Sequence, residues 1–193
     1  MPVSEYLWRA AVVDPPWEER GGGGRGAQNH YPLIKTSELP SVLQDSDKWK
    51  PFPNAHIYLW VTDNFLPDGL RLLEKMDFIY KRTWVWVKPN ISLGQYARSQ
   101  HELLLFGVKG SGMSQEVMTG RKDISSVIRA DSPLNAMGQR RHSAKPQEAY
   151  EMVEARSHGP YAEFFCRGPG RPGWMTWGNE ALATSDSTSK TRR

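Results

Sequence analysis

The sequence predicts an α/β protein with a mostly parallel β-sheet and helices on both of its faces. Short runs of apolar, β-branched and aromatic residues alternate along the chain with segments of helical periodicity. This alternation is typical of parallel strands joined by crossover helices. The 193 residues are enough for one domain with a full hydrophobic core. We therefore expect one three-layer domain over residues 1–180 and a disordered basic tail over residues 181–193.

The first half of the chain is expected to form two strands and two helices. The apolar run Ala10–Val13 predicts a buried strand, and the β-branched and aromatic residues of Asn54–Thr62 predict another. A helix is expected to begin within Thr36–Leu39, with a hydroxyl side chain as its N-cap. Asn64–Met76 carries apolar residues at helical spacing and predicts a second, amphipathic helix.

The rest of the chain, from Phe78 onward, is expected to form four more strands and a third helix. The strands are predicted at Phe78–Lys88, Glu102–Val108, Ser126–Arg129 and Tyr161–Cys166. The helix runs from Lys145 to about Arg156, with Pro146 near its first turn, where proline is tolerated.

Three irregular stretches interrupt this pattern, at residues 21–26, 90–100 and 110–141. The first holds five glycines and is expected to be a mobile loop. It does not match a phosphate-binding loop, because it lacks the Gly-Lys-Ser/Thr ending and does not open a helix. Phe164–Gly170 is the better candidate for a ligand site, since it follows a strand and its small residues let backbone approach a ligand closely.

Composition limits the class of protein. The single cysteine, Cys166, cannot form an intramolecular disulfide and fits a reducing cytoplasm. The sequence shows neither a signal segment nor an apolar run of membrane-spanning length, so we expect a soluble cytoplasmic protein. The formal net charge of +4 suits a nucleic-acid partner. No metal is expected.

The segment Asp14–Trp17, with the sequence Asp-Pro-Pro-Trp, directly follows the first predicted strand. Open α/β sheets bind ligands at the carboxyl ends of their strands. The two prolines fix φ and remove two donors, which leaves carbonyls to accept from an external amino group. Trp17 offers a face on which a base can stack. An ordinary strand-end turn would also explain these four residues, so the motif alone does not decide between the two.

Seven blocks of sequence share their order with a known family. They are Val13–Trp17, Asn29–Pro32, Tyr58–Thr62, Trp84–Asn90, His101–Gly110, His142–Pro146 and Arg171–Glu180. In these blocks the chain resembles the MT-A70 family of adenine-N6 methyltransferases, typified by the catalytic subunit of the eukaryotic messenger-RNA N6-methyladenosine writer. The resemblance extends roughly from Ala10 to Glu180 and is greatest to the small bacterial and phage members.

The resemblance implies a Rossmann-like methyltransferase domain that uses S-adenosylmethionine and releases S-adenosylhomocysteine. The catalytic motif comes before the cofactor strand, so the fold is expected to be circularly permuted. The resemblance also implies that the protein works in the cytoplasm of a bacterium or of a phage-infected host cell.

Seven positions match residues that contact the cofactor in the family. They are Asp14, Tyr31, Lys145, Phe165, Arg167, Asn179 and Glu180. Asp14 is expected near the methionine amine and the target amino group, and Lys145 near the methionine carboxylate or the site. Arg167 is expected to bond the ribose, and Asn179 the ribose or adenine. Glu180 stands where the eukaryotic enzyme has a glutamine, and Gln147 replaces an aspartate of the family pattern.

The predicted catalytic residues are Asp14, Pro15, Pro16 and Trp17. The predicted substrate contacts are Trp17, Arg20, Arg25, Tyr31, Tyr96, Arg98, Glu102, Arg140 and Arg141. Trp17 or Tyr31 would stack on the base, and the arginines, with Arg121 and Lys122, would contact phosphates. The Asp14 carboxylate and the Pro15 carbonyl would accept both hydrogens of the adenine amine and push its nitrogen toward tetrahedral geometry.

DNA is the expected substrate, with RNA as the alternative. Only the loops are available to read flanking bases, so short or relaxed sequence specificity is expected. A third interpretation is a non-catalytic nucleic-acid-binding subunit of a methyltransferase complex, against which the intact Asp-Pro-Pro-Trp motif argues. Methylation of a cytosine amino group is a lesser alternative. A homodimer through residues 90–100 is also expected from the resemblance, because the eukaryotic relative uses the corresponding loop as an interface.

Overall fold

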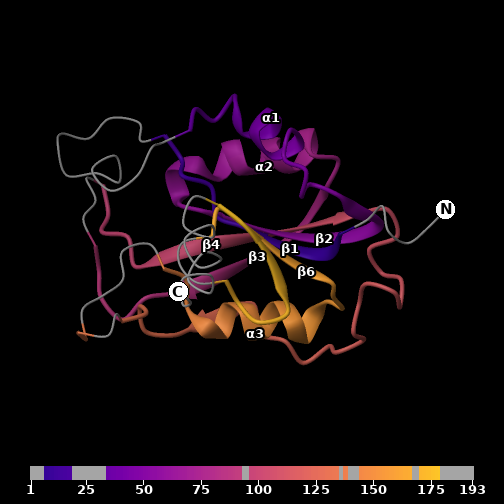
Figure 1. Cartoon of the computed structure of the whole chain (residues 1–193). Coiled ribbons are helices and arrows are strands. Elements are labelled where there is room, and N and C mark those ends of the chain that lie inside the picture. The colour runs from indigo at the N-terminus through magenta and orange to yellow at the C-terminus, as the bar shows by residue number, and fades with distance from the viewer. Residues whose placement is uncertain are drawn as a thin grey trace, which may run out of the picture.

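A computed structural model shows a three-layer α/β arrangement (Figure 1). It describes residues 7–18, 34–92, 96–134, 137–138, 144–166 and 170–178. One sheet lies between two helices on one face, α1 (Leu39–Gln44) and α2 (Leu66–Lys75), and one helix on the other, α3 (Gln147–Arg156). A short 3₁₀ turn at Asp63–Phe65 leads into α2.

In the described part of the chain, the sheet has seven strands in the order β5-β3-β4-β2-β1-β6-β7. Their bounds are β1 Trp8–Val13, β2 Pro51–Val61, β3 Ile79–Val87, β4 His101–Lys109, β5 Val127–Arg129, β6 Tyr161–Phe164 and β7 Trp174–Trp177. β4 pairs antiparallel with β2 and β3, and the other four pairings are parallel. At one end of the strands therefore lie the carboxyl ends of β1, β2, β3 and β6 and the amino end of β4. We name this end of the sheet the ligand edge.

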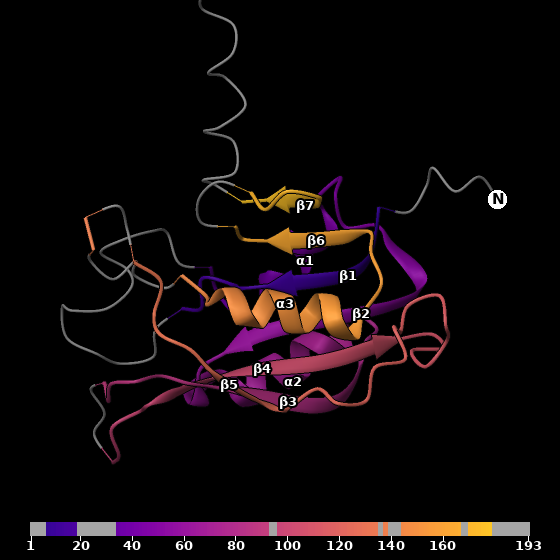
Figure 2. The same cartoon turned by 90° about the horizontal axis from the view of Figure 1, so that it is seen from below.

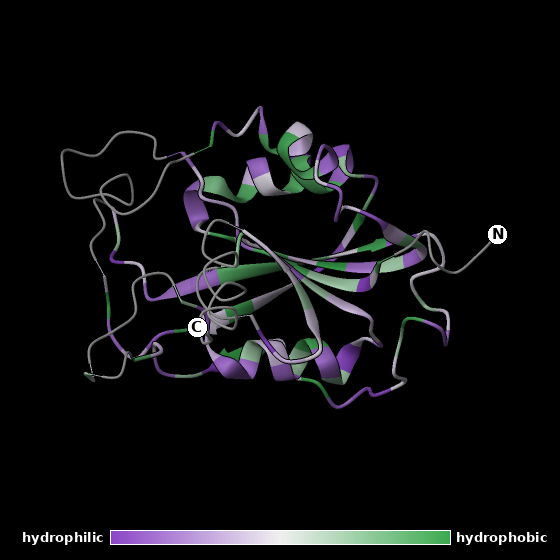
Figure 3. Cartoon of the chain, in the orientation of Figure 1, coloured by the Kyte–Doolittle hydropathy of each residue, from purple (hydrophilic) through white to green (hydrophobic). Residues whose placement is uncertain are grey.

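β1 is buried on both faces, which explains its continuous apolar sequence. Ala11 and Val13 pack into the core beneath α1 and α2, whereas Ala10 and Val12 pack into the core beneath α3. Figure 3 shows hydrophobic residues in the strands and in part of each helix, with hydrophilic residues in the connecting segments. This burial fixes β1 in the middle of the sheet and places the residue that follows it, Asp14, at the ligand edge.

The predicted α/β class, mostly parallel sheet and helices on both faces are confirmed. The predicted capping hydroxyl of the first helix is wrong. The N-cap is Glu38, which makes no side-chain capping bond. Pro40 lies in the first turn, where its fixed φ and missing N–H favour a helix start. Two features were not predicted, the reversed direction of β4 and the edge strand β7.

No helix in the described part of the chain is long and apolar enough to cross a membrane. The expected tail over residues 181–193 lies outside the described residues.

Leu73 and Leu70 of α2 form a matched pair for testing how this helix packs. Leu73 is fully buried, whereas Leu70 is 37% exposed. We expect Leu73→Ala to lower the free energy of unfolding by about 2–5 kcal/mol, the cost of a core cavity. Leu70→Ala should lower it by less than about 1 kcal/mol. Urea unfolding measures both, and equal losses would contradict the observed orientation of α2.

Candidate active site

The segment Asp14–Trp17 forms a turn that is fixed by backbone hydrogen bonds. The Asp14 N–H donates to the Phe164 carbonyl at 3.2 Å, which ties the end of β1 to the end of β6. The Trp17 N–H donates to the Pro15 carbonyl at 2.9 Å, and the Ile34 N–H donates to the Pro16 carbonyl at 3.1 Å. A carbonyl oxygen has two lone pairs, so each proline carbonyl can accept a second bond.

Trp17 corrects the prediction of a base-stacking surface. Its ring is only 9% exposed. It stacks on Phe65 with ring centroids 5.3 Å apart, and its Nε1–H donates to the Trp60 carbonyl at 3.0 Å. Because both the face and the polar edge of the ring are used inside the protein, Trp17 anchors the turn and is not placed to stack on a substrate.

A chain of four charged side chains occupies the ligand edge. Lys145 Nζ lies 3.0 Å from Asp14 Oδ2 and 3.2 Å from Glu102 Oε2. Glu102 Oε1 in turn lies 2.5 Å from Lys88 Nζ. We name these four residues the ion-pair chain. The Lys145 side chain is 6% exposed, Asp14 15% and Glu102 14%. These three members of the ion-pair chain are therefore largely shielded from water.

The strand directions bring these residues together. Asp14 follows β1 and Lys88 follows β3, so both lie at carboxyl ends of parallel-running strands. Glu102 is the second residue of β4, and it reaches the same edge only because β4 runs the opposite way. Lys145 precedes α3 and enters from the helix side, with Nζ 5.4 Å from the centroid of the Trp60 ring.

The ion-pair chain sets the protonation of Glu102. Burial alone would raise the pKa of this carboxyl, but the ammonium groups of Lys145 and Lys88 outweigh burial and lower the pKa. Glu102 is therefore a carboxylate at neutral pH. Glu102, which was predicted to contact the substrate, forms ion pairs with both Lys88 and Lys145. It is linked to Asp14 through Lys145, which pairs with both carboxylates.

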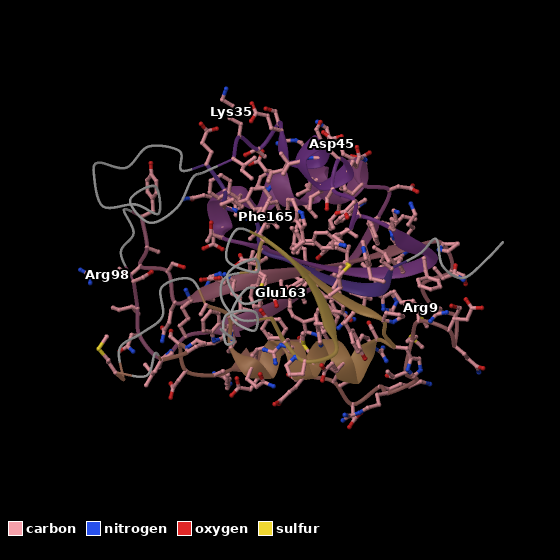
Figure 4. All side chains as sticks on the ribbon, viewed as in Figure 1. Arg9, Lys35, Asp45, Arg98, Glu163 and Phe165 are labelled. Carbon is pink, nitrogen blue, oxygen red and sulfur yellow. The ribbon has the colours of Figure 1, made fainter. Side chains whose placement is uncertain are left out.

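A third carboxyl group, Glu163 of β6, faces the same region and was not among the predicted residues. The Tyr150 hydroxyl of α3 donates to Glu163 Oε1 at 2.6 Å, and the Arg171 guanidinium lies 3.7 Å above the Tyr150 ring. Figure 4 labels Glu163, which belongs to β6, and Phe165, which directly follows it. A single acid within the apolar run of β6 was the sequence signal that could have indicated it.

Burial raises the pKa of Glu163, and the negative charge of Asp14 adds to this effect, although Tyr150 and Arg171 act in the opposite direction. Asp14 and Glu163 are thus two like-charged groups at the ends of neighbouring strands. Such a pair is relieved by a positively charged ligand group such as an ammonium or a sulfonium.

The backbone after β6 is shaped for close approach to β7. Phe165 has φ of 62°, which is uncommon for a residue other than glycine, and its ring meets Trp177 edge-on at 5.2 Å. The Cys166 N–H donates to the Trp177 carbonyl at 3.1 Å. A Cβ on Gly178 would lie 2.6 Å from the Cys166 nitrogen, so this position requires glycine. Strained backbone that the fold holds in place is a feature of ligand sites.

The remaining predicted residues are exposed on loops or lie outside the described structure. Tyr96 and Arg98 are exposed on the loop after β3. Arg121 donates to Asp123 at 2.8 Å, and its carbonyl accepts from Arg156 at the end of α3 away from Lys145. Arg121 therefore lies near the end of α3 that is farther from the ion-pair chain, and its predicted phosphate contact stays a prediction. The predicted residues outside the described structure are Arg20, Arg25, Tyr31, Arg140, Arg141, Arg167, Asn179 and Glu180.

The fold and the site define the class of the protein. The sheet is an open, mostly parallel α/β sheet of the Rossmann-like type, and such sheets bind ligands at the carboxyl ends of their strands. Asp14 and Glu163 lie at that end of the sheet, beside the strained turn at Phe165. The described residues hold no cluster of three or more His, Cys, Asp or Glu side chains that could bind a metal ion.

Comparison with known families agrees with this class. The MT-A70 family profile matches residues 8–180, and the chain belongs to this family. Its members are S-adenosylmethionine-dependent adenine-N6 methyltransferases. A comparison with curated proteins found no match.

Glu102→Gln tests the ion-pair chain through the pH dependence of stability. Because the folded pKa of Glu102 lies below its usual value of 4.5, the carboxylate stabilises the fold above that pH, and this stabilisation is lost as the pH falls through the folded pKa. We expect Glu102→Gln to lower the free energy of unfolding by about 1–3 kcal/mol at pH 7, and the difference from wild type to shrink below pH 4.5.

Urea unfolding over a pH series measures this difference. Glu74→Gln, on the exposed side of α2, is the control and should change stability by less than about 0.5 kcal/mol. A difference for Glu102→Gln that stays constant on acidification would contradict the arrangement.

Proposed function

We propose that this protein transfers a methyl group from S-adenosylmethionine to the N6 amino group of adenine in DNA, with short or relaxed sequence specificity. One observation carries the proposal. Asp14, the acid of the Asp-Pro-Pro-Trp motif, lies at the carboxyl end of β1, held by a buried lysine and next to the end of β6.

The proposed cofactor contacts divide into two groups. Asp14 and Glu163 bind the methionine amine, because both are acidic and lie at the ends of adjacent strands. Phe165, Arg167, Asn179 and Glu180, with Tyr31, bind the ribose and adenine, as the family resemblance implies. Lys145 is proposed to hold Asp14, since its ammonium already has two carboxylate partners. β6 follows the catalytic strand in the chain, and we propose that this order reflects a circular permutation of the methyltransferase fold.

The bound cofactor supplies a methyl group on a positively charged sulfur. The Asp14 carboxylate and the Pro15 carbonyl accept the two N–H bonds of the adenine amine and align its lone pair with the methyl carbon. Transfer would form the nitrogen–carbon bond and break the cofactor's sulfur–carbon bond, and the electron pair of the broken bond would stay on the sulfur. The extra proton on nitrogen then leaves through Asp14 to solvent. Lys145 fixes the orientation of the Asp14 carboxylate during this step.

A polynucleotide substrate is supported by a cavity of about 500 Å³ beside the ion-pair chain. Its lining includes Lys88, Gln100, Arg129, Asp131 and Glu148. Cations and an amide side chain can contact phosphates and base edges of the nucleotide next to the target. A base in a duplex must first be flipped out, at a cost of a few kcal/mol that a single strand largely avoids.

DNA is preferred over RNA in this proposal because the chain most resembles small bacterial and phage family members. We also propose a homodimer through residues 90–100. In the described part of this loop, Ile91 is 56% exposed and Tyr96 is fully exposed, which suits an apolar contact between copies. A monodisperse monomer in light scattering would contradict the dimer.

The proposed chemistry is tested by methyl transfer from labelled S-adenosylmethionine to matched single-stranded DNA, duplex DNA and RNA, with nucleoside mass spectrometry of the products. We expect N6-methyladenine in DNA. We expect Asp14→Asn to lower kcat by at least about 100-fold, because the Lys145 ammonium takes the one oxygen of the asparagine amide and leaves its NH2 group, a donor, facing the adenine amine. Asp45→Asn is the control, since Asp45 lies at the end of α1, away from β6 (Figure 4).

If N6-methyladenine forms only in RNA, the proposed mechanism stands and the proposal that DNA is the substrate is overturned. Unchanged turnover in Asp14→Asn would remove Asp14 from the mechanism. Absence of product on every substrate, with the cofactor bound, would favour the alternative of a non-catalytic subunit.

A further inference from the structure

A second cavity, of about 580 Å³, lies at the end of the sheet opposite to the ligand edge. It is built from the start of β3, the end of β4 and the loop after β4, with Arg156 from the last turn of α3. Figure 2 shows that α3 crosses the middle of the sheet and that β3 lies beside it, not beneath it. This part of the sheet face is therefore covered by an extended segment and not by a helix.

The floor of the cavity is aromatic. Phe106 meets Trp84 edge-on at 5.0 Å and His56 edge-on at 4.8 Å, and Trp84 stacks on Tyr58 at 5.5 Å. Two exposed apolar side chains stand at the rim, Ile79 at 63% and Met113 at 77% exposure. An aromatic floor with an apolar rim suits a flat ring that is buried on both faces.

A buried hydrogen-bond network holds this floor in place. The Gly112 carbonyl can only accept, so His56 Nε2–H donates to it at 2.7 Å, and His56 Nδ1 accepts from the Ser157 hydroxyl at 2.7 Å. The Tyr58 hydroxyl donates to Ser157 Oγ at 2.7 Å. Burial lowers the pKa of His56 to about 4, so the ring is neutral at pH 7. The network joins β2, the end of α3 and the loop after β4, and the cavity is pre-formed.

Three cations line the cavity: Lys81, Arg82 and Arg156. Among the residues that the structure describes, no acidic residue lines the cavity. The β3–β4 register shifts between Tyr80 and Arg82, and this bulge lets two consecutive side chains face the same cavity, where a regular strand would turn one of them away. Within the described part of the chain, none of the three cations forms an ion pair with a carboxylate.

Arg156 has an unused donor at this site. Its Nε is buried without a hydrogen-bond partner among the described residues, while another of its nitrogens donates to the Arg121 carbonyl. Three positive charges around one cavity repel one another, and a bound phosphate would relieve that repulsion and accept from Arg156.

We propose that this cavity binds a nucleotide unit, with the base against Phe106 and Met113 and the phosphate on Lys81, Arg82 and Arg156. The volume fits the range of small-ligand sites. The unit is either a free mononucleotide or one nucleotide of a longer strand, and the second source rests on the proposed function.

The test is isothermal titration calorimetry with adenosine 5′-monophosphate and with a short single-stranded DNA, in excess S-adenosylhomocysteine. We expect the double variant Lys81→Gln/Arg82→Gln to weaken binding by about ten-fold or more. Met113→Glu should weaken it similarly, because a negative charge at the rim repels phosphate. The control Lys50→Gln/Lys75→Gln removes the same charge from exposed positions elsewhere and should alter binding by less than about two-fold.

Loss of monophosphate binding in the cavity variants identifies a free nucleotide as a sufficient ligand. If the cavity variants lose binding of the single-stranded DNA alone, the ligand of the cavity is one nucleotide within a strand. Cavity variants that bind both probes as the control does, or a wild-type protein that binds neither, would overturn the inference.

Methyl transfer is measured in parallel to separate the two proposals. Methyl transfer without cavity binding leaves the proposed function intact and overturns this inference alone. If the cavity binds the monophosphate but no methyl transfer occurs, this inference stands and the proposed function is overturned.

Discussion

The ammonium group of Lys145 is buried between two carboxylates, and the arrangement of the ligand edge depends on it. A buried charge costs several kcal/mol unless close partners of opposite charge compensate it. Asp14 and Glu102 supply that compensation at 3.0 and 3.2 Å. Since these partners come from β1 and β4, the register and direction of both strands are tied to the position of a residue that precedes α3.

This constraint gives neighbouring carboxyl groups different electrostatic environments. Asp14 and Glu102 face ammonium groups, whereas Glu163 faces a tyrosine hydroxyl and has a raised pKa. Carboxyl groups whose surroundings give them different pKa values are common in catalytic sites. The paired lysine orients Asp14, and the negative charges around the end of β1 suit a positively charged cofactor. In the proposed function, Asp14 therefore takes part both in cofactor binding and in recognition of the adenine amine.

The sequence predicts much of this site, but not how its residues meet. The apolar run Ala10–Val13 is buried on both sides, so its pattern places Asp14 at a strand end with little ambiguity. The reversed direction of β4 leaves no local signal in an apolar strand, and without it Glu102 cannot be assigned to the ligand edge. Glu163 was missed because its partner Tyr150 lies on α3, and their contact depends on how that helix crosses the sheet. Trp17 was predicted to be a stacking surface because an aromatic residue in a turn does not reveal that the Trp60 carbonyl will bind its ring.

The coupling between Asp14 and Lys145 is the central claim, and a double-mutant cycle on cofactor affinity tests it most directly. The affinity for S-adenosylmethionine is measured by calorimetry for wild type, Asp14→Asn, Lys145→Met and the double variant. If Lys145 acts by holding Asp14, the double variant loses no more affinity than the worse single variant, with a coupling free energy of about 1–3 kcal/mol. Losses that add to within about 0.5 kcal/mol would show that the two residues act independently and would contradict this arrangement.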